Sequence, residues 1–155
     1  MKPLLLLFVL LTACGGRLSD EQRRKLREGM ELNTIRKVSD AELTEAAFAL
    51  GRSVSEAIDN IPIGDRRRID SVEGHYHVRI RALQAGDSLL LALEKQLVEA
   101  YTSSAGQVSD DVQRLGADSL LYTKPVMKST PDGAMEFRYA LGIRLPVREV
   151  VLSIR

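Results

Sequence analysis

One cysteine, Cys14, has the position in this chain that most directly predicts a chemical reaction. It is the only cysteine among 155 residues, and it follows Leu11-Thr12-Ala13. The apolar run Leu4–Leu11 before it is too short to span a bilayer, which takes about 20 residues. A lysine, a short apolar run and a small-residue cleavage site form a secretory signal, and a cysteine at the first mature position makes it a lipoprotein signal. We therefore expect cleavage before Cys14 and acylation of its thiol and freed amine, with fatty acids such as palmitate.

Acylation of Cys14 predicts where the protein lies and how the chain is divided. The mature protein would attach to the lipid bilayer of the cell envelope without crossing it. A glycine and not an aspartate follows the cysteine, which favours the outer membrane, on its periplasmic or surface face. Residues 1–13 are then the signal peptide, 14–18 a lipid-anchored tether, 19–38 an N-terminal helix and 39–155 the folded domain.

Two histidines, His75 and His77, are the remaining residues whose spacing invites a metal-binding interpretation. Tyr76, Val78 and Ile80 alternate with polar residues, which predicts a strand, and residues two apart on a strand share a face. Two histidines are still too few for a metal site: acylated Cys14 is no ligand, and no third ligand is identified. We therefore treat them as weak candidates, predict no metal and no catalytic residues, and favour a polar outer face.

Charge and composition exclude several classes of function. The chain carries 22 lysines and arginines against 21 acidic residues, and loss of Lys2 with the signal makes the two counts equal. Such balance gives no electrostatic basis for nucleic-acid binding, which we do not expect. The sequence also lacks a nucleophile-elbow, metalloprotease or phosphate-loop motif, so an enzyme is not predicted.

The elements that must hold any site begin with helices. Ser19 with Gln22 and Ser39 with Glu42 have the spacing of capping boxes, which predicts helices starting at these serines. Small residues on the apolar stripe of the second helix, including Gly51, predict the close approach of another element. Arg66-Arg67-Arg68 is expected in a loop. A third helix follows Gly86-Asp87; its predicted buried residues are Leu90, Leu91, Leu93, Leu97, Val98 and Tyr101, and its predicted outer residues are Glu94, Lys95 and Glu99.

The second half of the chain predicts a hairpin. The segment 110–115 is interpreted as a helical turn, and a strand is expected from about Ser119, with Pro125 requiring an edge position or a bulge. Thr130-Pro131-Asp132-Gly133 predicts a turn, and a return strand follows over Met135–Leu145. Pro146 is expected to start a final helix, in which Val150, Val151 and Ile154 face the core. The order predicts an α+β domain with helices packed on a small antiparallel sheet.

Several of these segments together resemble a known family, the PAS-like periplasmic sensor domains that carry a c-type haem and are catalogued as a domain of unknown function. The similar pieces are, in order, EAAFALGRSVSEAI, YHVRIRAL, LEKQLVEAY, DSLLYTKPVM and ALGIRLPVREVV. They cover roughly Asp40–Arg155. The resemblance implies a small antiparallel PAS-like sheet flanked by N-terminal and connecting helices, export from the cytoplasm, and redox or small-molecule sensing.

The chain departs from that family at the haem. The family attaches haem through Cys-x-x-Cys-His after the segment that corresponds to Leu121–Met127, and here Lys128–Gly133 holds neither cysteine nor histidine. Thioether attachment is therefore impossible, and no cofactor is predicted. The sequence favours a haem-free sensory module that binds a small ligand or an envelope protein partner. The alternative is a structural or assembly lipoprotein of the envelope.

Overall fold

The computed structural model describes residues 19–32, 37–104 and 108–154. The chain forms two compact units that divide between Lys37 and Val38, and each is described by itself. In the first unit, helix α1 (Asp20–Leu32) begins with the predicted capping box: Gln22 N–H donates to Ser19 Oγ at 3.3 Å, and Ser19 N–H donates to Gln22 Oε1 at 3.0 Å. Cys14, with the signal and the tether, lies outside the described residues.

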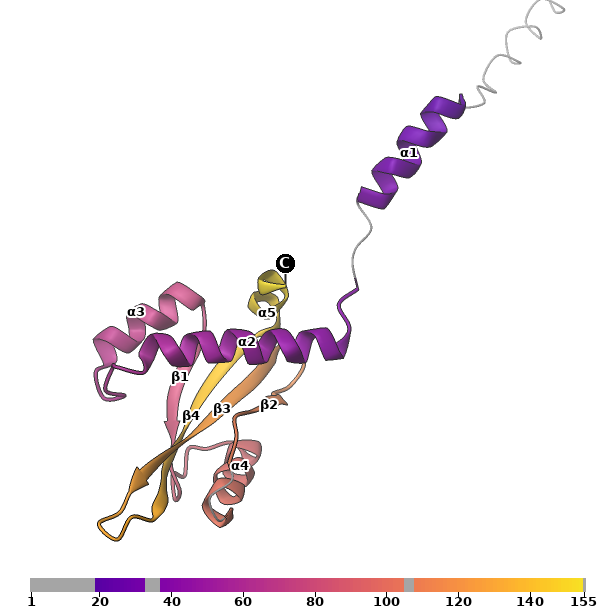
Figure 1. Cartoon of the computed structure of the whole chain (residues 1–155). Coiled ribbons are helices and arrows are strands. Elements are labelled where there is room, and N and C mark those ends of the chain that lie inside the picture. Colours follow the sequence, from indigo (N-terminus) through magenta and orange to yellow (C-terminus); the bar gives the residue numbers. More distant parts are fainter. Residues whose placement is uncertain (1–18, 33–36, 105–107, 155) are drawn as a thin grey trace, which may run out of the picture. The chain divides into compact units, whose positions relative to one another are not determined.

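The second unit is built on an antiparallel sheet with strand order β1-β4-β3-β2 (Figure 1). Its strands are β1 (Arg79–Leu83), β2 (Asp111–Arg114), β3 (Ser119–Ser129) and β4 (Met135–Pro146). The helices are α2 (Asp40–Ile58), α3 (Arg66–Tyr76), α4 (Ala92–Ser103) and α5 (Val147–Ser153). An α+β domain with helices flanking a small antiparallel sheet is thereby confirmed.

One face of the sheet is covered by α2, α3 and α5, which hold the larger hydrophobic core. Leu43, Ala47, Val54 and Ile58 form the buried stripe of α2, at the three- and four-residue spacing of an amphipathic helix. They pack with Ile69 of α3, Val150 of α5 and alternate strand residues, which are Ile80, Leu120, Tyr122, Leu141, Ile143 and Leu145. The Ser39–Glu42 capping box that starts α2 is confirmed.

Gly51 lets α2 approach β3 closely. A Cβ atom at position 51 would overlap Tyr122 Cγ and Cδ2, so glycine is required by the space and not by its backbone angles. The Tyr122 ring also meets Phe48 edge-on, with centroids 6.4 Å apart. The close approach predicted from small residues in this helix is confirmed at Gly51.

The opposite face of the sheet carries α4 over part of its area. Val98 and Tyr101 of α4 pack with Leu83, Leu90 and Ala140 in a second, smaller core. Tyr101 Oη also lies 2.7 Å from Thr123 Oγ1, which ties α4 to β3. Strand alternation thus sends even-numbered residues of β4 from Ala140 to Arg144 toward the α4 face.

Two segments have a different structure from that predicted. Arg66-Arg67-Arg68 opens helix α3 and is not a loop: Asp65 caps the helix by accepting from Arg68 N–H at 3.3 Å, and Ile69 is buried. The segment predicted as a helical turn is strand β2, which pairs with residues 120–123 of β3. Both segments are dominated by charged residues, and their structure follows from contacts with the sheet that local patterns do not reveal.

The hairpin follows the prediction. Gly133 has φ +86°, and its N–H donates to Thr130 O at 2.9 Å. Pro125 lies on β3 beyond the end of β2, where β3 is itself an edge of the sheet, and the register shifts between Val126 and Met127, so both predicted settings for this proline are present. In α5 Val150 is buried as predicted, whereas Val151 is exposed. Across the described ranges, no helix combines the length and apolarity needed to cross a bilayer.

Candidate binding site on the α4 face of the sheet

The two histidines do not share a strand face, so that prediction is wrong. His75 lies in the last turn of α3, and His77 caps the helix in the left-handed conformation with φ 53°. Both side chains are exposed, and β1 begins only at Arg79. The helix continues through Tyr76 because Ile69, Val72 and Tyr76 pack on the core at helical spacing. In the described residues, no group of three or more histidine, cysteine, aspartate or glutamate side chains could hold a metal.

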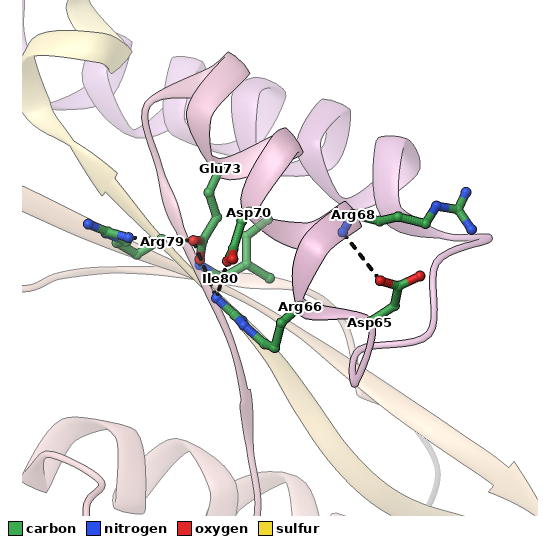
Figure 2. A network of polar contacts seen from close by, with 7 residues as sticks. All are labelled: Asp65, Arg66, Arg68, Asp70, Glu73, Arg79 and Ile80. Atoms are coloured by element: carbon green, nitrogen blue, oxygen red, sulfur yellow. Dashed lines mark hydrogen bonds and ion pairs between the residues drawn. The ribbon is translucent and has the colours of Figure 1, made fainter.

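A buried carboxylate in the last turns of α3 organises one side of the candidate site. Glu73 is 6% exposed, and its Oε1 accepts from Ile80 N–H at 2.6 Å. Its Oε2 lies 3.5 Å from Arg66 Nη2 and 3.5 Å from Arg79 Nη1, and Arg66 also pairs with Asp70 at 2.7 Å (Figure 2). Burial of a carboxylate is tolerated because these donors replace water.

The hydrogen bond from Ile80 N–H to Glu73 follows from the position of β1 at the edge of the sheet. Within the described residues, strand β1 lies at the edge of the sheet and pairs with β4 alone, so every second amide along it points away from the ladder. Glu73 reaches this outer side from α3 and accepts one such amide proton. The carboxylate therefore fixes α3 to the edge strand and, through the same group, holds Arg66 and Arg79 near each other.

A second buried carboxylate, Glu94 of α4, holds the other side. Glu94 is 1% exposed, so the prediction that it lies on the outer side of its helix is wrong. Its Oε2 accepts from Leu91 N–H at 2.8 Å at the start of α4, and its Oε1 accepts from Arg144 Nη2 at 2.7 Å. Arg144 Nε is buried and has no hydrogen-bond partner in the described part of the chain, a cost of about 1–3 kcal/mol for such a donor.

The register of the sheet brings three arginines together. Arg79 of β1 is the direct partner of Arg144 of β4, and Arg81 is the partner of Gly142. Directly opposite residues of an antiparallel pair share a face, as do residues two apart on one strand. Arg79, Arg81 and Arg144 therefore occupy one patch of the α4 face, beside Glu94.

This patch lines an open hollow of about 320 Å³, which we call the arginine hollow. Its charged lining residues are Arg66, Arg79, Arg81, Arg144, Glu73 and Glu94. A neighbouring hollow of about 630 Å³ shares Arg79, Arg144 and Glu73 with it and is also lined by His77. His77 thus borders the wider depression, although it has no place among metal ligands.

Gly142, Leu83 and Leu121 form the apolar part of the arginine hollow. A Cβ atom on Gly142 would lie 2.8 Å from Leu83 Cδ1 and 2.9 Å from Leu83 Cγ. Because Gly142 has no side chain, Leu83 can pack directly over it. Space is also left between Arg81 and Thr123, the two cross-strand partners of Gly142.

A separate polar cluster joins α2 to the far edge of the sheet. Arg52 donates to Asp110 through Nε at 2.6 Å and Nη2 at 3.2 Å, and Tyr122 Oη donates to Asp110 Oδ2 at 3.1 Å. The hydrogen bonds from Arg52 hold the pKa of Asp110 below its ordinary value, whereas burial, followed by the charge of Asp110, raises the pKa of Tyr122. The Tyr122 hydroxyl therefore keeps its proton and its hydrogen bond to Asp110, and this cluster has the character of a structural tie.

Sequence reasoning missed the residues of the arginine hollow. It assigned Arg79 and Arg81 to the solvent-facing side of a strand. It also placed Glu94 on the outer, solvent-facing side of its helix. The available signal was the pair Arg79 and Arg81 at strand spacing together with Arg144 on the return strand, but their meeting depends on register. Comparisons with protein-family models, curated proteins and solved structures found no match, so the chain is placed in no family by similarity.

Proposed function

We propose that this chain is a lipid-anchored protein of the bacterial cell envelope whose α+β domain binds a small ligand in the arginine hollow and catalyses no reaction. The anchor rests on the lipoprotein signal that ends at Cys14. Outer-membrane attachment, favoured by the glycine after Cys14, and a PAS-like sensory role, which the resemblance motivates, belong to the same proposal. Haem has no part in it, because the sequence contains no Cys-x-x-Cys-His.

The observation that carries the binding role is the polar hollow on the α4 face of the sheet. Ligand sites are concave, with an apolar surface and a small number of converging polar groups, and volumes of about 300–1,000 Å³ are typical. The arginine hollow measures about 320 Å³ and combines Leu83, Leu121 and Gly142 with charged side chains that two buried carboxylates hold in position. Burial of Glu73 and Glu94 costs desolvation, and besides joining α3 and α4 to the sheet the two carboxylates hold arginine side chains in the lining of the hollow.

The structural or assembly role remains a second candidate because of two exposed leucines. Leu89 and Leu91 precede α4 and are 76% and 44% exposed. Apolar side chains so close in sequence and so exposed are suited to contact with an envelope protein. A structural or assembly role of this kind would not require the arginine hollow.

Native mass spectrometry of the intact protein extracted from its own membrane tests the proposal. We expect a co-purifying small molecule on the wild-type protein and its loss from Gly142→Val, in which the new side chain pushes Leu83 out of its place in the apolar floor without a change of charge. Circular dichroism establishes that this variant is folded before the result is interpreted. Gly64→Val is the matched control, because a Cβ atom at Gly64 meets nothing within 4 Å. A ligand that Gly142→Val retains would contradict the site, and a protein partner without a small molecule would favour the second candidate.

A further inference from the structure

The direct pairing of Arg79 with Arg144 is a like-charge pair that the fold brings together. The two residues are opposite each other in the β1–β4 ladder, and Arg81 lies two residues further along the same face. Like charges directly opposite in a sheet are destabilising. The sheet thus concentrates positive charge at this position, at a cost in stability.

The carboxylates beside these arginines are already in use. Glu73 accepts from the amide of Ile80 as well as from Arg66 and Arg79, and Glu94 accepts from the amide of Leu91 as well as from Arg144. Among the residues that line the arginine hollow, four arginines therefore face two glutamates whose oxygens are shared with backbone amides. The lining alone has two more positive than negative charges, but Asp70 and Asp87 beside it pair with Arg66 and Arg81 and balance them. The hollow therefore attracts an anion through N–H donors that remain unused and not through net charge.

The guanidinium groups keep donors for a further acceptor. An arginine carries five N–H donors, and the ion pairs of Arg79 and Arg81 each engage one terminal nitrogen, at 3.5 Å from its carboxylate oxygen. Arg79 is 80% exposed and Arg81 is 40% exposed, so these donors are open to a ligand from solvent. Planar guanidinium groups bind carboxylate and phosphate through two parallel hydrogen bonds.

We propose that the arginine hollow binds a small molecule through a carboxylate or phosphate group, which lies between Arg79, Arg81 and Arg144. The remainder of the molecule lies over the apolar floor at Leu83 and Gly142. This inference rests on the proposed function and specifies its ligand. An oxyanion at this point reduces the repulsion between Arg79 and Arg144, which in the absence of ligand pair with Glu73 and Glu94 respectively.

Isothermal titration of the full-length protein in detergent tests the ligand class with four probes. Succinate and citrate represent organic acids, glycerol phosphate represents phosphate esters, and succinamide is the neutral counterpart of succinate. We expect saturable binding of at least one anion, no binding of succinamide, and affinity that falls with added salt. Binding of succinate or citrate identifies a carboxylate as the ligand group, and binding of glycerol phosphate alone identifies a phosphate.

Charge-matched variants localise the binding. Arg79→Gln/Arg81→Gln should lower anion affinity about tenfold or more, since two charge-assisted contacts are lost. Arg67→Gln/Arg148→Gln removes the same charge from two exposed arginines that do not line the hollow, and it should bind as the wild type does. If the double variant is unstable, the single variant Arg79→Gln, at the most exposed of the three arginines, replaces it in the binding measurement. Circular dichroism establishes that each variant is folded.

Three results would overturn the inference: no anion binding by the folded wild type, equal loss in both double variants, or succinamide binding as well as succinate. The proposed function fails separately. If native mass spectrometry shows a neutral ligand that Gly142→Val removes, the hollow is a binding site and only the anion assignment is wrong. If no small molecule is found by either method, both are wrong.

Discussion

Gly51 of α2 faces the ring of Tyr122 on β3 with no room between them for a methyl group. Because Tyr122 is buried and its hydroxyl is held by Asp110, the ring cannot swing away. Gly51→Ala should therefore destabilise the domain by about 1–3 kcal/mol through overpacking, despite the better helix propensity of alanine.

Thermal unfolding followed by circular dichroism measures this loss. Gly64→Ala is the control, since its added methyl group meets open space. An equal or higher unfolding temperature for Gly51→Ala would show that α2 is not held at this distance from the sheet.

The Arg52–Asp110 pair predicts a pH dependence of stability. The hydrogen bonds from Arg52 lower the pKa of folded Asp110 below its ordinary value of 3.8. The stabilisation is therefore complete above about pH 5 and is lost as the pH falls through the folded pKa. Asp110→Asn should lower the free energy of unfolding by about 1 kcal/mol at pH 7 and by progressively less below pH 4. Urea unfolding at a series of pH values measures this difference. A stability difference between wild type and Asp110→Asn that stays constant across pH would contradict the assignment.

Glu94→Gln tests the buried carboxylate under the arginine hollow. The amide keeps the size of the side chain but removes the charge that faces Arg144, so we expect a loss of about 1–3 kcal/mol in the free energy of unfolding. Glu99→Gln, on the exposed side of the same helix, should change stability by less than about 0.5 kcal/mol. Similar losses for the two variants would mean that Glu94 is not paired as described.

Cys14 predicts lipidation that is open to direct measurement. Wild-type protein should incorporate labelled palmitate and remain with the membrane fraction, whereas Cys14→Ser should remain unprocessed or appear as a soluble exported protein. Wild-type protein without label, in a host with active lipoprotein processing, would refute the anchor.

The lack of a Cys-x-x-Cys-His motif in the sequence also has a spectroscopic consequence. Protein purified from cells with active c-type haem maturation should show no Soret band, because the sequence offers no thiol pair for thioether attachment. A stoichiometric Soret band would show that haem is held by other ligands.

Local patterns were sufficient for elements whose signals lie within a few residues. The capping box at Ser39, the turn at Gly133 and the return strand that begins at Met135 depend on neighbours in sequence, and all were predictable. Helix α3 was missed because Arg66-Arg67-Arg68 hides a narrow apolar line, of which Ile69 is the buried member. A few apolar residues at spacings of three and four, after the possible cap Asp65, were the available signal.

The candidate site was beyond sequence reasoning for a different reason. Glu94 is both a helix-start acceptor and the partner of Arg144, and neither role is visible in a pattern that marks glutamate as solvent-facing. Arg79 meets Arg144 only through the β1–β4 register, which is set by packing over the whole sheet. Residues far apart in sequence thus form the site, and no local spacing encodes their meeting.

The hydrogen bond from Ile80 to Glu73 has a consequence for molecules crowded on a surface. A lipid anchor would hold many copies side by side, where a bare strand edge invites pairing between neighbouring chains. Glu73 occupies an outward amide of β1 with a negative charge, and the other edge strand, β2, spans only Asp111–Arg114. These two strands therefore offer a reduced template for edge-to-edge pairing, whereas β3 beyond Thr123 keeps an outer edge that β2 does not cover.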